Sequence, residues 1–362
     1  MSGYLPDDES FSRTVYSNLS DALFIDPRLK ERRNLQKQYA RALSKLESFV
    51  ADALASKEVP FIPKMSENLE KGYHQSTLAQ KHFRSVAQSI AMIGTLSDKY
   101  LYSEYIDTFR QACSKLGIIG NTFDWGVYNA PVLPCSEFNN EPNADVFNSL
   151  WRECKEIYRT CGYAAKRSTR IRDLARISDN YVEYMDSAFQ VTDDIVVVRL
   201  DLFYLPALAD SITLERACED LSRLVEYHRC NKIFRHKLCF MAKIELGLLG
   251  RIHIHLILVY DGSKPDLPNH ITIGRRVGAY WSGTITKNNG DYWNVNDKIH
   301  EFERWGVCGI GPININDHAR RENFRTRVVR YLLKPDQFAK LRAGDLHKLL
   351  RRGKPLIILM AA

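Results

Sequence analysis

Apolar residues recur every three or four positions through the first half of the chain, a pattern typical of amphipathic helices. The spacing predicts helices over residues 28–55, 76–94, 97–117 and 145–185. Ser76 and Ser97 are candidate N-caps for the second and third of these helices. A segment rich in Asn, Pro and Gly over 121–143 predicts a long loop. We therefore expect a mainly α-helical domain over residues 1–188.

Near residue 190 the pattern changes to runs of β-branched residues with alternating apolar and polar positions. Strands are predicted over 193–206, 237–250 and 251–261. A short helix is predicted within 270–286, further helices over 211–230 and 318–337, and a turn over 287–297. This order indicates an α+β fold, in which one antiparallel sheet carries helices on its face. We expect the second domain to cover residues 189–341 and a basic tail to follow over 342–362.

The hydrophobic and charged fractions, 45% and 26%, are those of an ordinary globular protein. Because the chain has no run of 18 apolar residues and no signal-like start, we expect a cytoplasmic protein without a membrane partner. The eight cysteines form no CxxC pair, so we expect them to be reduced packing residues rather than zinc ligands.

Positive charge is concentrated near the C-terminus. From Arg320 to Lys354 twelve Lys or Arg residues stand against three acidic ones, an excess larger than the net charge of +8 for the whole chain. Such a segment suggests a polyanionic partner, nucleic acid first. The alternative is a solvated basic tail with no partner.

Two histidines lie in the aliphatic run RIHIHLILVYDG, which begins at Arg251. Because side chains alternate across a strand, His253 and His255 share one face, while the neighbouring Ile and Leu residues take the other face, which belongs in the core. Glu245 on the preceding strand reaches the same face if the two strands form a hairpin. Two imidazoles and a carboxylate suit Mg²⁺ or Mn²⁺, with coordination positions left open for substrate oxygens.

A second candidate group lies in the segment RVVRYLLKPDQ, where Tyr331 and Lys334 are three residues apart and share one face of a helix. A phenol has a pKa near 10, so as a nucleophile it needs a nearby ammonium or a metal-polarised phosphate. Attack of this phenol on a phosphodiester would leave a 5′-phosphotyrosyl enzyme and a free 3′-hydroxyl. Taken in isolation, Tyr331 also fits a half-buried aromatic residue with no chemical role.

Three segments in this order resemble the signatures of the HUH endonuclease superfamily, in particular rolling-circle replication initiators. They are the hydrophobic strand IVVVRLDLFY from Ile195, the pair His253 and His255, and the Tyr331-to-Lys334 segment. More narrowly, RIHIHLILVYDG and VVRYLLKPDQ resemble inovirus-type replication proteins and the prophage-encoded YagK/YfjJ-like C-terminal domain. The resemblance covers residues from about 190 to 341 and does not extend to the N-terminal half.

The resemblance implies a metal-dependent nuclease that nicks and joins single-stranded DNA to start rolling-circle replication of a phage, prophage or plasmid-like element. His253, His255 and Glu245 would be the metal ligands, Tyr331 the nucleophile and Lys334 its assistant. Asp201, on the first of the three segments, is an alternative residue for the site. Some members use two tyrosines one turn apart, whereas this helix has Tyr331 alone, so transfer of a second strand would need another nucleophile.

Aromatic residues beside basic ones fit a protein that binds single-stranded DNA by stacking. They are Tyr280, Trp281, Tyr292, Trp293 and Trp305, near Arg275, Arg276 and Lys287. We expect most of these rings to be core residues and one or two to contact DNA. The glycine-rich segment Gly306–Asn314 lacks the following Lys-Ser/Thr of a nucleotide loop, so we expect no nucleotide site there. Because the sequence has no Walker motif, we expect no attached helicase.

Two other functions stay open. A relaxase or transposase of the same superfamily would use the same chemistry, and a DNA-binding regulator would retain the scaffold without catalysis. For residues 1–188, recognition of origin duplex DNA, oligomerisation and recruitment of a host helicase or replication protein are equally compatible with the sequence.

Overall fold

The computed structural model describes residues 30–65, 71–94, 96, 100–118, 131, 134–135, 141–209, 211–226, 231–246, 252–333, 339–341 and 349–354. The chain divides into two compact units, Met1–Arg172 with Gln337–Lys340, and Asp173–Asp336 with Leu341–Ala362. The division therefore falls inside a helix, α6 (Tyr163–Asp186). The reason is that the last turns of α6 pack into the core of the second unit through Val182 and Met185.

The first unit is mainly helical, as predicted. Its helices are α2 (Lys30–Ala55), α3 (Thr77–Ile93), α4 (Glu104–Lys115), α5 (Asn143–Thr160) and the start of α6. Its strands are the short β1 (Phe61–Met65), β2 (Lys71–Gln75), β3 (Tyr100–Tyr102), β4 (Pro134–Cys135), β5 (Glu141–Pro142) and β11 (Ala339–Leu341). Phe49, Phe61, Phe83 and Phe147 form edge-on or tilted aromatic pairs in its core.

The structure corrects three details of this unit. α4 is capped by Ser103, whose Oγ accepts a hydrogen bond from the Ile106 N–H, and the expected start at Ser97 lies outside the described residues. The helical tract expected over 145–185 is two helices, since Gly162 between them has a φ of +64° that continues no α-helix. The β1–β2 hairpin falls where the helical pattern predicted no strand.

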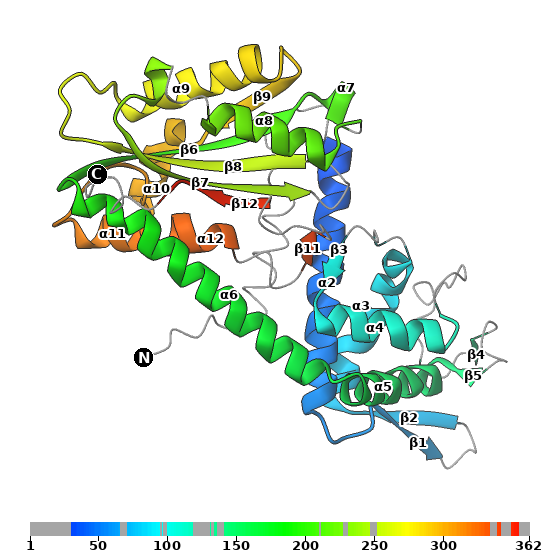
Figure 1. Cartoon of the computed structure of the whole chain (residues 1–362). Helices are drawn as coiled ribbons and strands as arrows, with labels where there is room; N and C mark the ends of the chain where they lie inside the picture. Colours follow the sequence, from blue (N-terminus) through cyan, green and yellow to red (C-terminus); the bar gives the residue numbers. More distant parts are fainter. Residues whose placement is uncertain are drawn as a thin grey trace. The chain divides into compact units, whose positions relative to one another are not determined.

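The second unit is built on a six-stranded antiparallel sheet in the order β10-β6-β8-β7-β12, with β9 also paired to β6 (Figure 1). Its strands are β6 (Asp194–Tyr204), β7 (Lys237–Leu246), β8 (Ile252–Asp261), β9 (Gly290–Asn294), β10 (Gly311–Asn314) and β12 (Leu350–Arg352). Its α-helices after α6 are α7 (Pro206–Ala209), α8 (Leu214–Glu226), α9 (His270–Tyr280), α10 (Ile299–Arg304), α11 (His318–Asn323) and α12 (Arg330–Leu333). The α+β class with one antiparallel sheet is thus confirmed.

Shorter helical turns complete the second unit. They are η3 (Ser187–Gln190), η5 (Lys232–Phe234), η6 (Trp281–Ile285), η7 (Val295–Lys298) and η8 (Phe324–Val329). The helix expected over 318–337 is interrupted, because η8 is a π-helical segment between α11 and α12. Such segments are rare and frequently occur at functional sites.

Helices cover both faces of the sheet, which the sequence pattern did not predict. In Figure 1, α8 and α9 lie on one face, and α11 and α12 on the other. Ile257 and Val259, on the same face of β8 as the two histidines, pack in one hydrophobic cluster with Leu332 and Leu333 of α12. All ten residues of β8 are buried. The histidine face is therefore a second core face and not a solvent face.

Two segments expected to lack strands contribute edge strands. β9 forms within the turn expected over 287–297, and its Asn294 pairs with Leu200 of β6. β12 forms within the basic tail expected over 342–362, and its Leu350 pairs with Lys243 of β7. Residues Leu350–Arg352 of that tail are therefore a component of the sheet.

Several arginines of the basic C-terminal region are paired within the second unit. Arg321 and Arg325 both contact the carboxylate of Asp186, Arg330 contacts Asp179, and Arg320 contacts Glu303. Arg352 lies over the rings of Tyr181 and Tyr184. These pairs neutralise part of the charge that suggested a polyanionic partner.

None of the helices in the described part of the chain combines the length and the apolar character that a membrane crossing needs.

Candidate metal centre

The central strands of the second unit bring the expected metal ligands together. β7 and β8 pair antiparallel, with Glu245 opposite His253 and Lys243 opposite His255. On the other side of β8, β6 places Asp201 opposite His255. Since side chains alternate along each strand, all five of these residues project from one face of the sheet.

Glu245, His253 and His255 form a compact donor set. His253 Nε2 and His255 Nε2 lie 3.2 Å apart, and Glu245 Oε2 lies 3.2 Å from the former and 3.3 Å from the latter. Donors that neighbour one another around an octahedral Mg²⁺, at ligand distances of 2.0–2.1 Å, are about 3.0 Å apart. Their three donor atoms all lie within 4.8 Å of one another, close enough to hold one metal ion. The donors present therefore fit one divalent cation.

Asp201 faces this centre, but as a partner of His255. Its Oδ1 lies 2.6 Å from His255 Nδ1, the ring nitrogen that does not face Glu245 and His253. A carboxylate on the outer nitrogen of a histidine fixes the orientation of the ring and directs the other nitrogen to the metal. Asp201, the alternative residue for the site, therefore lies at the centre as a partner of His255.

The three donor residues are buried, whereas the hairpin alone suggested an open site. Glu245, His253 and His255 are 8%, 6% and 9% exposed. Their face of the sheet also packs against η8 and α12, which explains the low exposure. Buried charges of this kind need partners, and the site supplies them to one another.

Charge pairing controls the ionisation of the centre. Burial alone would lower the pKa of His255, but the carboxylates of Asp201 and Glu245 outweigh burial and raise that pKa to about 9. Burial would raise the pKa of Asp201, but His255 and Arg199 lower it to about 2. The pKa of Glu245 is held well below its ordinary value because Lys243 and His255 outweigh burial. In the metal-free protein His255 is therefore protonated at neutral pH. The proton on its Nε2 then lies where the metal ion would bind.

This proton predicts that metal binding strengthens with rising pH. A cation must displace the proton from His255, whose pKa lies above neutrality, so the protonated, competing form grows as the pH falls. Below the pKa of about 9, the apparent Mn²⁺ affinity is expected to fall about tenfold for each unit of pH. Calorimetry at pH 6 and pH 8, in buffers of different ionisation enthalpy, measures the affinity and the proton released. An affinity that is equal at the two pH values would contradict this assignment.

Of the two predicted catalytic residues, Tyr331 and Lys334, the structure describes Tyr331. Tyr331 lies in α12 and is partly exposed, and Lys334 lies outside the described residues. Leu332, the next residue after Tyr331, is linked to the donor set through Lys243. The Nζ of Lys243 lies 2.5 Å from the carbonyl oxygen of Leu332 and 2.8 Å from Glu245 Oε1.

Lys243 is a part of the centre that the sequence pattern did not single out. It is 4% exposed, and its alternation with Glu245 along β7 was a signal that places both on one face. A buried lysine at such a position calls for a charged partner, which here is Glu245.

The five aromatic residues, of which one or two were expected to contact DNA, differ in exposure. Trp281 is fully buried, and its Nε1 donates to the carbonyl oxygen of Phe203, so it is a core residue. Tyr292 packs under α9, where a Cβ at Gly278 would lie 2.1 Å from its ring. Trp305, 58% exposed, is the ring among the five that is most available for stacking.

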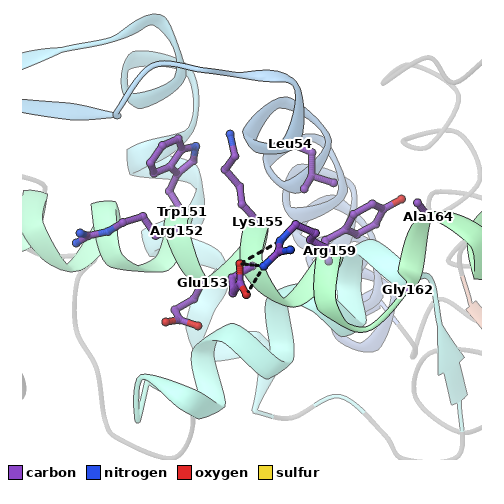
Figure 2. A pocket seen from close by; sticks show the side chains of 10 residues that line it. Leu54, Trp151, Arg152, Glu153, Lys155, Arg159, Gly162 and Ala164 are labelled. Atoms are coloured by element: carbon purple, nitrogen blue, oxygen red, sulfur yellow. Dashed lines mark hydrogen bonds and ion pairs between the residues drawn. The ribbon is translucent and has the colours of Figure 1, made fainter.

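A separate hollow lies within the first unit and holds none of the metal-centre residues. Figure 2 shows its lining, which includes Leu54, Trp151, Lys155, Arg159 and Ala164. Its charged groups are engaged locally, since Arg159 pairs with Glu156 and Lys155 donates to the carbonyl oxygen of Ser56. The β7–β8 centre is therefore the stronger candidate for chemistry.

Comparisons of the chain with protein-family models, with curated proteins and with solved structures give no match.

Proposed function

We propose that this chain is a metal-dependent endonuclease of the HUH type, which nicks and joins single-stranded DNA to initiate rolling-circle replication. The observation that carries the proposal is the convergence of Glu245, His253 and His255 on adjacent strands, with donor atoms 3.2–3.3 Å apart. Asp201 contacts the outer nitrogen, Nδ1, of His255. The helix that carries Tyr331, α12, contacts Lys243 through the carbonyl oxygen of Leu332.

Each residue of the centre has a separate role in the proposed phosphoryl transfer. Glu245, His253 and His255 would hold Mg²⁺ or Mn²⁺, which when bound supplies positive charge for the oxygens of the scissile phosphate. Asp201 holds the His255 ring in the orientation that directs Nε2 to the centre. The two imidazoles must be neutral to serve as ligands, so the proton of His255 leaves when the centre is loaded.

Tyr331 supplies the nucleophile. Its phenol oxygen forms a bond to phosphorus while the bond from phosphorus to the 3′-oxygen breaks, and the phenol proton is balanced by the proton taken up by the leaving 3′-oxygen. The products are a 5′-phosphotyrosyl enzyme and a free 3′-hydroxyl. Attack by that hydroxyl reverses the step and rejoins the strand without ATP, because the phosphotyrosyl bond conserves the energy of the phosphodiester. Lys334 would assist by orienting the phosphate or stabilising charge.

Incubation of the full chain with single-stranded DNA that contains the replication origin, in the presence of Mn²⁺, tests the proposal. After denaturing electrophoresis we expect a covalent protein–DNA band that is absent when EDTA is added. DNA cut without any covalent band, or no cutting under any metal, would contradict the proposed chemistry.

One observation favours a second candidate, a DNA-binding regulator that retains the scaffold. The donor set is at most 9% exposed, which also suits a metal centre with a structural role. Such a protein would bind Mn²⁺ and origin DNA with no covalent band. A relaxase or transposase would form the same band on a transfer-origin or transposon-end sequence, so the DNA sequence distinguishes these from a replication initiator.

A further inference from the structure

A buried lysine joins the metal centre to the helix that carries the tyrosine. Lys243 is 4% exposed, lies on the same face as Glu245 and is paired in register with His255. Among its contacts with described residues, its Nζ donates to the carbonyl oxygen of Leu332 at 2.5 Å and forms an ion pair with Oε1 of Glu245 at 2.8 Å. A desolvated ammonium is costly unless such acceptors surround it, so these contacts fix the position of its side chain.

Each contact restrains a different part of the site. Lys243 donates to the carbonyl oxygen of Leu332 in α12, the residue that follows Tyr331. The other contact is an ion pair with Oε1 of Glu245, whose Oε2 lies beside the two histidines. The same ammonium therefore restrains the metal-binding carboxylate and the backbone next to Tyr331.

We propose that Lys243 is a positioning residue that couples metal binding at Glu245 to the placement of α12, and through α12 to the placement of Tyr331. This inference rests on the proposed function for the role of Tyr331, but the coupling itself is a property of the fold. Because coupling between two sites is reciprocal, an ion bound at Glu245 should stabilise α12.

The coupling predicts that Lys243→Met changes Mn²⁺ affinity and the rate of adduct formation differently. This variant keeps much of the side-chain volume but removes the charge. Mn²⁺ affinity is expected to be kept or to increase, since a positive charge beside the ligand Glu245 is lost. The rate of covalent adduct formation is expected to fall by about 100-fold, the scale of a 1 Å misplacement of reacting groups. A purely structural role would weaken both properties together.

Hydrogen–deuterium exchange supplies a readout that does not depend on activity. In the wild type, added Mn²⁺ should slow exchange in peptides that cover α12, and in Lys243→Met this slowing should be absent. Lys243→Arg keeps the positive charge and the N–H donors, so it should retain part of the protection. This variant also tests the coupling if Lys243→Met does not fold. Lys237→Met is the matched control, because Lys237 lies on the same strand but contacts the rings of Phe234 and Phe240.

The outcomes separate the two proposals. If the wild type forms the adduct and Lys243→Met forms it equally fast, the coupling is wrong while the nuclease proposal stands. If the wild type forms no adduct, the nuclease proposal fails. The coupling is then decided by exchange alone: protection of α12 by Mn²⁺ that depends on Lys243 supports it, and protection that is absent or unchanged in the variant overturns it.

Discussion

Replacement of Tyr331 by Phe is expected to abolish the covalent protein–DNA band. The change removes one oxygen atom, the atom that forms the bond to phosphorus, and keeps the ring. Because Tyr331 is partly exposed in α12, loss of its hydroxyl should have little effect on folding. DNA affinity and Mn²⁺ affinity should therefore remain close to those of the wild type. Denaturing electrophoresis with end-labelled single-stranded origin DNA measures the band.

Tyr181→Phe is the matched control for this variant. Tyr181 belongs to α6 in the same unit, and its ring is partly buried beneath Arg352, so the variant loses a tyrosine hydroxyl outside the donor set. It should form the adduct as the wild type does. If Tyr331→Phe forms the adduct at the wild-type rate, Tyr331 is not the nucleophile, and another residue must carry the covalent bond.

Loss of Glu245 and loss of Asp201 are expected to weaken Mn²⁺ binding to different extents. Glu245→Gln replaces a carboxylate donor with a neutral amide, so it should lose more affinity than a change behind the donors. Asp201→Asn leaves all three donors in place but removes the carboxylate that orients His255. Loss of such a partner typically lowers metal affinity about 10–100-fold. Titration of Mn²⁺ followed by electron paramagnetic resonance measures the free ion and hence both affinities.

The order of these two effects is itself informative. If Glu245→Gln binds Mn²⁺ like the wild type, the donor set is wrong. If Asp201→Asn loses as much affinity as Glu245→Gln, then Asp201 is a ligand and not a support. Glu301→Gln provides the control, since Glu301 pairs with Lys298 by a contact at the protein surface and should leave the affinity unchanged.

The donor set could be predicted from the sequence because it depends on local rules. The alternation along RIHIHLILVYDG places His253 and His255 on one face whatever surrounds them. A hairpin between β7 and β8 then places Glu245 within reach, and the observed register puts it opposite His253. The α+β class followed in the same way from the change of period near residue 190.

What the sequence did not show depends on contacts between distant segments. The short strand β12 exists because it pairs with β7, about 100 residues earlier, and its own residues have no strand pattern. The histidine face is buried because η8 and α12 pack on it, and Lys243 reaches Leu332 across 89 positions of the chain. Arg321 and Arg325 suggested a binding surface for a polyanion, but the same long-range packing brings both to Asp186.

A crystal of the full chain grown with Mn²⁺, with diffraction recorded at the manganese absorption edge, tests the metal centre most directly. We predict one anomalous peak in the second unit that is bonded to His253 Nε2, His255 Nε2 and Glu245 Oε2, with Asp201 still on Nδ1 of His255. A well-ordered β7–β8 hairpin with no peak between these atoms, or a peak held by other residues, would contradict the proposed centre and the nuclease function built on it.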